Sequence, residues 1–302
     1  MLETKENNVR IEGILNEINL AEGNFTRVDG TKCDSISGTI IIGVTQDING
    51  VATDLSIPVH MFAAKYTNDG RPNPAYEGMQ KVMKEYVSVA AAGIDAADRV
   101  RITHGQITMN EYYNQNGNLV SFPRISSSFV SKVKKEEFKP TAVFTAVFVV
   151  GRKVAETDKD GIETGKYKIS GLLPQYGGKI DVVPFYAVNP GVIDAISQYW
   201  NEGDTVRASG KVNFTSRTEI RKVEVDFGEP TEESRTISVS ELLITGGNST
   251  PLDGDFAIDN DEVQKALTDR TARLEQLKNK KPATTKGSHT APAKNKFNDL
   301  GF

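Results

Sequence analysis

The sequence predicts a mainly β protein, in which two similar five-stranded barrels, each with a helix between its third and fourth strands, precede a C-terminal helix and a disordered tail. An internal repeat is the first reason. Asp98–Ile107 and Asp204–Phe214 both begin Asp-x-Val-Arg, soon reach a glycine, and alternate apolar with polar residues. Alternation is typical of a half-buried β-strand, because successive side chains point to opposite faces.

The residues before the two copies match as well. Leu55–Ala63 and Lys179–Val188 each have the pattern of a strand with an embedded proline, and helix-like segments follow at Tyr76–Val89 and Gly191–Trp200. A repeat of about a hundred residues indicates two duplicated domains and not a solenoid. The chain of 302 residues is long enough for two ordinary domains and a tail.

Five strands are expected in the first unit. Alternation predicts the first, β-branched isoleucines favour the second, and the turn at Asp47–Gly50 leads into the third. The loop Asn68–Pro74 precedes the helix, whose apolar residues recur at helical spacing and are typical of core packing. The expected strands are Val9–Ile18, Asp34–Val44, Leu55–Ala63, Val100–Tyr113 and Leu119–Val133.

The second unit repeats this plan. Its first strand is a nearly continuous apolar run, and Gly177-Gly178 is the hairpin turn before its third strand. Asn189 is a preferred N-cap and Pro190 suits the first position of the short helix. The expected strands are Ala142–Val150, Tyr167–Leu173, Lys179–Val188, Asp204–Phe214 and Thr236–Ile244.

This order of strands and helix is what an oligonucleotide-binding (OB) fold requires, namely a five-stranded Greek-key barrel with a helix at one end. Periodicity alone would equally allow another small barrel. We expect a first OB-fold-like domain at residues 1–135, a second at residues 136–248, and a C-terminal segment at residues 249–302.

The composition changes in the C-terminal segment. Residues 261–279 are expected to form a helix that docks on the second barrel or on a partner copy, and we favour the first alternative. Residues 280–296 are rich in Lys, Pro, Ala, Thr, Ser and Gly, which predicts disorder. The apolar stripe of the helix consists of Val263, Leu267, Leu274 and Leu277.

Composition argues against several classes of protein. The single cysteine, Cys33, excludes an internal disulfide and a Cys-based zinc site, and three distant histidines argue against a His-rich metal centre. No apolar run reaches the roughly 18 residues of a membrane span, and the polar start lacks a secretory signal. The net charge of −4 argues weakly against a generally basic surface but leaves a basic groove open.

Enzymatic motifs are missing. The chain has no Gly-x-Gly-x-x-Gly after a strand, no Walker A loop and no Gly-x-Ser-x-Gly elbow. The paired acidic residues lie in charged stretches that are expected to be exposed. We therefore expect no catalytic residues, no cofactor and no metal.

The chain stops with Lys296-Phe297-Asn298-Asp299-Leu300-Gly301-Phe302. This ending resembles the C-terminal tip of bacterial and phage single-stranded-DNA-binding proteins. There, a disordered tail ends in an acidic stretch, an apolar residue, a proline and a terminal phenylalanine. Here Gly301 replaces the proline and one acid is present; the predicted partner-binding tip is Phe297, Asp299, Leu300 and Phe302. An aromatic ring beside a carboxylate suits a pocket with an apolar floor and a basic rim. With the two repeats, the plan resembles phage-type proteins of this class with tandem OB domains.

Single-strand binding needs a basic groove and exposed aromatic rings on which bases stack. Core packing is the alternative for each ring, favoured for Phe122 and Phe214, and a solvated face is the alternative for each cation. Tyr112 and Tyr113 are adjacent and should point to opposite faces. The predicted nucleic-acid-binding residues are Arg99, Arg101, Tyr112, Tyr113, Arg124, Arg152, Lys153, Tyr167, Lys168, Tyr176, Lys179, Arg207 and Arg217.

We expect a cytoplasmic protein, in the host cytoplasm if phage-encoded, that coats and protects single-stranded DNA during replication or recombination. The resemblance implies that the tail recruits replication or recombination proteins, and RNA stays open as a ligand. Two alternatives also stay open. One is a structural β-barrel protein of a virion, which would self-assemble; the other is an adaptor whose barrels bind polypeptide.

Overall fold

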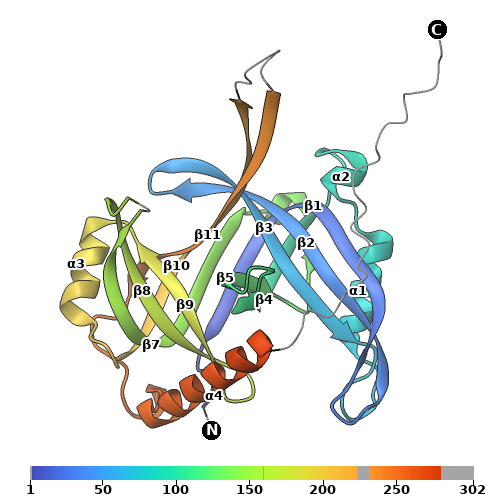
Figure 1. Ribbon diagram of the computed structural model, residues 1–302. Coiled ribbons are helices and arrows are strands. Elements are labelled where there is room, and N and C mark those ends of the chain that lie inside the picture. Colours follow the sequence, from blue (N-terminus) through green and yellow to red (C-terminus); the bar gives the residue numbers. More distant parts are fainter. Residues whose placement is uncertain (1, 159, 224–230, 280–302) are drawn as a thin grey trace.

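The computed structural model describes residues 2–158, 160–223 and 231–279, without the side chains of residues 217–223 and 231–237. The expected disordered tail and the predicted tip lie outside the described residues. Figure 1 shows two β-barrels side by side, with one helix packed below the second barrel. Among the described residues, none of the helices combines the length and apolar character that crossing a membrane requires.

The first barrel is a closed sheet of five strands. Its strands pair in the order β1-β2-β3-β5-β4, and β1 also pairs with β4, which closes the barrel. The pairing of β3 with β5 is parallel and the other pairings are antiparallel. The strands are β1 (Asn7–Thr26), β2 (Lys32–Ile48), β3 (Val51–Ala64), β4 (Arg99–Tyr113) and β5 (Leu119–Ser126), and a short β6 (Ser131–Lys132) pairs antiparallel with the start of β4.

The second barrel has the same topology. Its strands pair in the order β7-β8-β9-β11-β10, β10 closes on β7, and β9 pairs with β11 in parallel. The strands are β7 (Thr141–Thr157), β8 (Glu163–Gln175), β9 (Lys179–Ala187), β10 (Thr205–Val223) and β11 (Thr231–Gly247). The long hairpin of β10 and β11 projects beyond the barrel (Figure 1).

A helix separates the third and fourth strands of each barrel, as the sequence predicts. These helices are α1 (Pro74–Glu85), which a short α2 (Val89–Ala92) follows, and α3 (Pro190–Tyr199). Asn73 and Asn189 cap them, since each side chain accepts a hydrogen bond from a first-turn N–H and a proline follows. The predictions of a mainly β fold and of a helix between the third and fourth strands of each five-stranded barrel are confirmed.

Two elements are shorter than the sequence predicts. Helix α1 ends at Glu85 although its apolar period continues, because the carboxylate of Asp98 accepts the backbone N–H of Val87 at 2.8 Å. Strand β5 ends at Ser126, and the Ser127 hydroxyl then accepts the N–H of Phe129. Local side-chain hydrogen bonds of this kind compete with helices and ladders.

Alternation along the strands fills both barrels with apolar side chains. Ile57, Val59 and Met61 on β3 are fully buried or nearly so, while the residues between them are at least partly exposed. In the second barrel Phe148 stacks on Phe185 with ring centroids 4.6 Å apart. Burial of such side chains is the main stabilising contribution to each barrel.

The barrels meet along strands β1 and β7, which pair antiparallel and join both barrels into one sheet of 11 strands. Val9 pairs with Phe144 across this seam. Val9 also pairs with Gly105, and Phe144 with Gly210, which are the glycines of the two sequence repeats. Equivalent residues therefore meet at the seam, as at the axis of a symmetric dimer.

Side-chain contacts between the barrels obey the same pseudo-two-fold relation. Gln46 of β2 donates a hydrogen bond to the carbonyl oxygen of Val212 on β10, at 3.2 Å. Gln175 of β8, at the equivalent position, donates to the carbonyl oxygen of Ile107 on β4, at 2.9 Å. Val212 and Ile107 each lie two residues after the glycine of their repeat. An interface in which each half contributes the same contact is called isologous.

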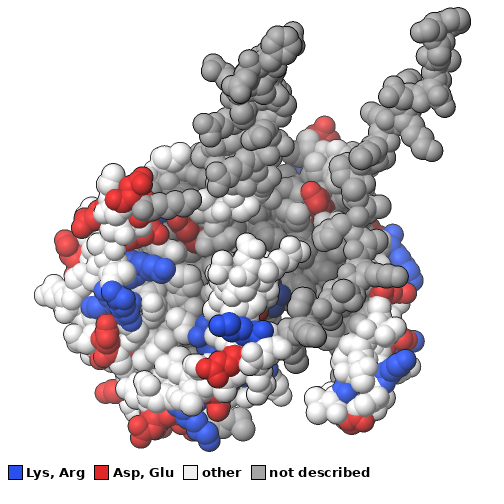
Figure 2. Space-filling model, in the orientation of Figure 1, with Lys and Arg blue, Asp and Glu red and all other residues white. Residues whose placement is uncertain are grey.

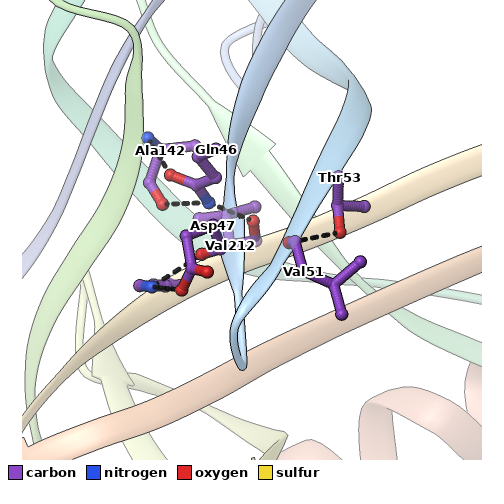
Figure 3. Close-up of polar contacts among 7 residues, drawn as sticks. Gln46, Asp47, Val51, Thr53, Ala142 and Val212 are labelled. Carbon is purple, nitrogen blue, oxygen red and sulfur yellow. Dashed lines mark hydrogen bonds and ion pairs between the residues drawn. The ribbon is translucent and has the colours of Figure 1, made fainter.

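Figure 3 shows the first of these contacts, near the tip of the β2–β3 hairpin. Gln46 also donates to the carbonyl oxygen of Ala142 at 3.2 Å and accepts the N–H of Ala142 at 2.9 Å. Next to it, the carboxylate of Asp47 forms an ion pair with Lys211 of β10, at 3.0 Å. Within the hairpin, the hydroxyl of Thr53 donates to the carbonyl oxygen of Val51 (Figure 3).

Helix α4 (Asn260–Asn279) packs on the second barrel, as the sequence predicts for residues 261–279. Val263 and Ala266 join a cluster with Val147, Val149 and Ile180 of strands β7 and β9. The expected stripe is largely borne out: Leu274 is buried and Leu267 is half-buried, while Leu277 is exposed. Two arginines of α4, Arg270 and Arg273, also form ion pairs with Glu111 on β4 of the first barrel.

Candidate nucleic-acid interface

The outer side of strands β3, β4 and β5 carries several aromatic side chains. Alternation turns buried residues inward and leaves His60 and Phe62 of β3 on the outer side, with Phe62 45% exposed. On the hairpin of β4 and β5, Tyr112 and Phe122 are exposed, and their rings make an edge-to-face contact with centroids 6.5 Å apart. We call this surface, together with Arg124 of β5, the first-barrel face.

A hollow of about 410 Å³ lies at one side of the first-barrel face. Its walls include His60, Phe62, His104, Gln106 and Phe129. Phe129, in the segment after β5, is 59% exposed, and Phe62 is exposed as well. The hollow thus offers aromatic surface and neutral polar groups to solvent. Flat ligands with hydrogen-bonding edges fit such a combination.

Arg124 is the cation of the first-barrel face. Its Nε lies 3.5 Å from the hydroxyl of Thr108, and among the described residues no carboxylate pairs with it. Burial lowers the pKa of Arg124, which the charge of Asp181 partly offsets. Burial, and then the charge of Arg124, lower the pKa of His60. At neutral pH, an unpaired guanidinium therefore lies beside an uncharged imidazole.

Three of the predicted cations are engaged in the fold. Arg101 forms an ion pair with the buried carboxylate of Glu12 at 2.6 Å, and Arg207 contacts Glu6 through two nitrogens. Lys153 donates to the carbonyl oxygen of Trp200, just after the end of α3. A phosphate would have to compete with these partners, so we assign these side chains to the stability of the fold before any role in binding.

The other predicted residues are distributed over both barrels. Arg99 lies over the ring of Phe138, Tyr113 is half-buried, and Tyr167 packs against the apolar core. The side chain of Arg217 lies outside the described residues. On the second barrel, Arg152, Tyr176 and Lys179 are exposed and Lys168 is half-buried.

Of the predicted set, the structure brings Tyr112 and Arg124 together on the first-barrel face. Phe122 is also there, 38% exposed, so the expectation that it packs in the core is wrong, whereas Phe214 is buried as expected. The sequence interpretation missed the hollow beside them. The outward positions His60 and Phe62 could have been found from the alternation of β3, but no local signal marks Phe129.

Charge on the remaining surface is mixed. On the side of the molecule shown in Figure 2, basic and acidic side chains are interspersed, and no broad basic surface is visible. Among the residues that the structure describes, no group of three or more His, Cys, Asp or Glu side chains could hold a metal ion. The first-barrel face combines aromatic rings with Arg124, which forms no ion pair with another described residue.

Two solved structures similar to this chain are of the single-stranded DNA binding protein from Thermus aquaticus. The wild-type protein has a TM-score of 0.46 and 8% sequence identity, with 84% of this chain and 97% of that chain covered. A deletion mutant of it has a TM-score of 0.44 and 10% identity, with 82% and 95% covered.

No curated protein matches the sequence. The family model described as YorF matches residues 5–280. Because the match spans most of the chain, the chain belongs to the YorF family.

Proposed function

We propose that this chain binds single-stranded DNA through the first-barrel face and the hollow at its side. One observation carries the proposal: exposed aromatic rings share the outer side of an OB-fold-like barrel with Arg124, which is half-buried and forms no ion pair with another described residue. Stacking rings and a cation for the phosphate backbone are the two things that single-strand binding requires. OB folds bind oligonucleotides on the surface of their second and third strands and the adjoining loops, and β3 contributes to this face.

The binding mechanism is passive. Bases stack on Phe62, Phe129, Tyr112 and Phe122, each stack contributing about 1–3 kcal/mol, while Arg124 contacts a phosphate. Because stacking tolerates every base, sequence preference should be small. Because phosphate contacts release counterions, affinity should fall as salt rises.

The wider role proposed is coating and protection of single-stranded DNA in the cytoplasm during replication or recombination. In this proposal residues 1–135 and 136–248 are the two domains, and residues 249–302 recruit partner proteins through Phe297, Asp299, Leu300 and Phe302. RNA is a second ligand to compare, because stacking and phosphate contacts do not distinguish it.

Fluorescence anisotropy with labelled oligo-dT and oligo-U, at low and high salt, tests the proposal. Phe62→Ala and Phe129→Ala should each weaken binding about 5- to 150-fold, which corresponds to one base stack. Tyr199→Ala is the matched control, because Tyr199 is an exposed ring on α3 of the other barrel, 42% exposed. Absence of binding by the wild-type chain at low salt would refute the proposal. Self-assembly seen by size-exclusion chromatography would then favour the virion alternative.

A further inference from the structure

The two barrels present equivalent outer faces, and the strand register shows which residues correspond. In the first barrel, the buried residues Ile107 and Ile125 pair across β4 and β5, and the next pair along these strands is Thr108 and Arg124. In the second barrel, the equivalent buried residues Val212 and Leu242 pair across β10 and β11, and the next pair is Asn213 and Glu241. A glutamate therefore occupies the position of the unpaired arginine.

The parallel strand pairs agree with this correspondence. His60 and Tyr186 each lie two residues after the embedded proline of their strand. Each also pairs in register with the fifth strand of its barrel, two residues beyond the position of Arg124 or Glu241. The register of two independent strand pairs thus identifies Arg124 and Glu241 as equivalent.

Around Glu241, the second face holds charges that pair with each other. Lys166 forms an ion pair with Glu241, whose side chain is only 14% exposed, and Asn213 donates a hydrogen bond to the same carboxylate at 3.0 Å. The ammonium group of Lys166 also lies 5.9 Å from the centre of the Tyr186 ring. Burial and the nearby carboxylates of Glu156 and Glu241 raise the pKa of Tyr186.

We propose that a single strand is held by the first barrel alone, with Arg124 as the phosphate-binding residue, while the equivalent face of the second barrel is closed to phosphate by Glu241. The inference rests on the proposed function. Physically, a phosphate near Lys166 would have to displace a carboxylate that the fold holds in place, and the same carboxylate would repel it. Within the described part of the chain, no carboxylate forms an ion pair with Arg124 that a phosphate would have to displace.

Two variants and a control test this asymmetry by anisotropy with oligo-dT over a salt series. Arg124→Gln should weaken binding about tenfold and reduce the slope of log K against log salt by about 0.7, which corresponds to one phosphate contact on a single strand. Lys84→Gln, which removes an exposed cation from α1, should leave the slope unchanged. The double variant Lys166→Gln/Glu241→Gln keeps the net charge and should bind within about twofold of wild type.

A length series adds an independent readout. Affinity should stop rising at a length that one OB barrel covers, about 4–16 nucleotides. If the wild type binds but the double variant is weaker and Arg124→Gln is not, the asymmetry is wrong while the proposed function stands. If the wild type does not bind, the proposed function fails first. Melting temperatures of all variants should match the wild type within a few degrees, which separates lost contacts from lost folding.

Discussion

Replacing Gln46 by alanine should destabilise the protein more than the equivalent change at Gln175. Gln46→Ala removes three hydrogen bonds between the barrels and leaves the N–H of Ala142, a fully buried residue, without that acceptor. An unsatisfied buried donor costs about 1–3 kcal/mol. Gln175→Ala removes one bond to the carbonyl oxygen of Ile107, which still accepts from Asn7 at 2.9 Å. That loss should cost about 0.5–1.5 kcal/mol.

Urea unfolding at pH 7, followed by tryptophan fluorescence, measures both changes. The single tryptophan, Trp200, is buried in the second barrel, and far-UV circular dichroism reports on both barrels. A lower midpoint with an unchanged slope would show lost stability without a change in the surface exposed on unfolding. Equal losses for the two variants, or a larger loss for Gln175→Ala, would refute this assignment of the seam contacts.

Three further substitutions have predictable signs. Arg101→Gln should lower the melting temperature at pH 7, and the difference in melting temperature from wild type should narrow in acid. Burial raises the pKa of Glu12, but the hydrogen bond from Arg101 and other contacts hold this pKa below 4.5. The stability that Arg101 and Glu12 contribute is therefore lost as the pH falls through the lowered pKa. Asp181→Asn should stabilise the protein at pH 7 but not below pH 3.8, because burial raises the pKa of Asp181 and the folded state favours the neutral form. Thermal melts across pH show this change, and a difference in melting temperature that stays constant with pH would contradict it. Gly210→Ala should lower the free energy of unfolding, measured by chemical denaturation, more than Gly105→Ala does. The new Cβ at position 210 would lie 2.0 Å from a strand carbonyl oxygen, whereas the one at position 105 would lie 3.0 Å from such an oxygen. Similar losses of stability in the two variants would count against this reasoning.

The barrels could be predicted from the sequence because their signals are local. Alternation, the repeated Asp-x-Val-Arg and the Asn189-Pro190 cap each act over a few residues, so the strand order and the helix position follow. Contacts between distant segments could not be predicted in this way. Glu12 occurs in an alternating strand and resembles a solvent-facing residue, yet its partner Arg101 is 89 positions further along the chain.

Part of the candidate site could also be predicted from local sequence signals, and part depends on contacts between distant segments. Tyr112 and Arg124 lie on one hairpin, so a strand-by-strand interpretation could group them. The hollow with His60 and Phe129 depends on the parallel pairing of β3 with β5, which only tertiary structure provides. Likewise, the partners of Arg207 and Lys153 come from distant segments, and a list of cations cannot separate them from unpaired ones.

The seam between β1 and β7 joins halves that belong to one polypeptide, and this has a consequence for variation. In a homodimer, association depends on protein concentration, and every substitution appears twice, once on each subunit. Here both partners are tethered, so the assembled state survives dilution, and a change in one half leaves the other as it was. A single chain that carries both halves can thus place an arginine and a glutamate at corresponding positions, which a symmetric pair of identical chains could never do.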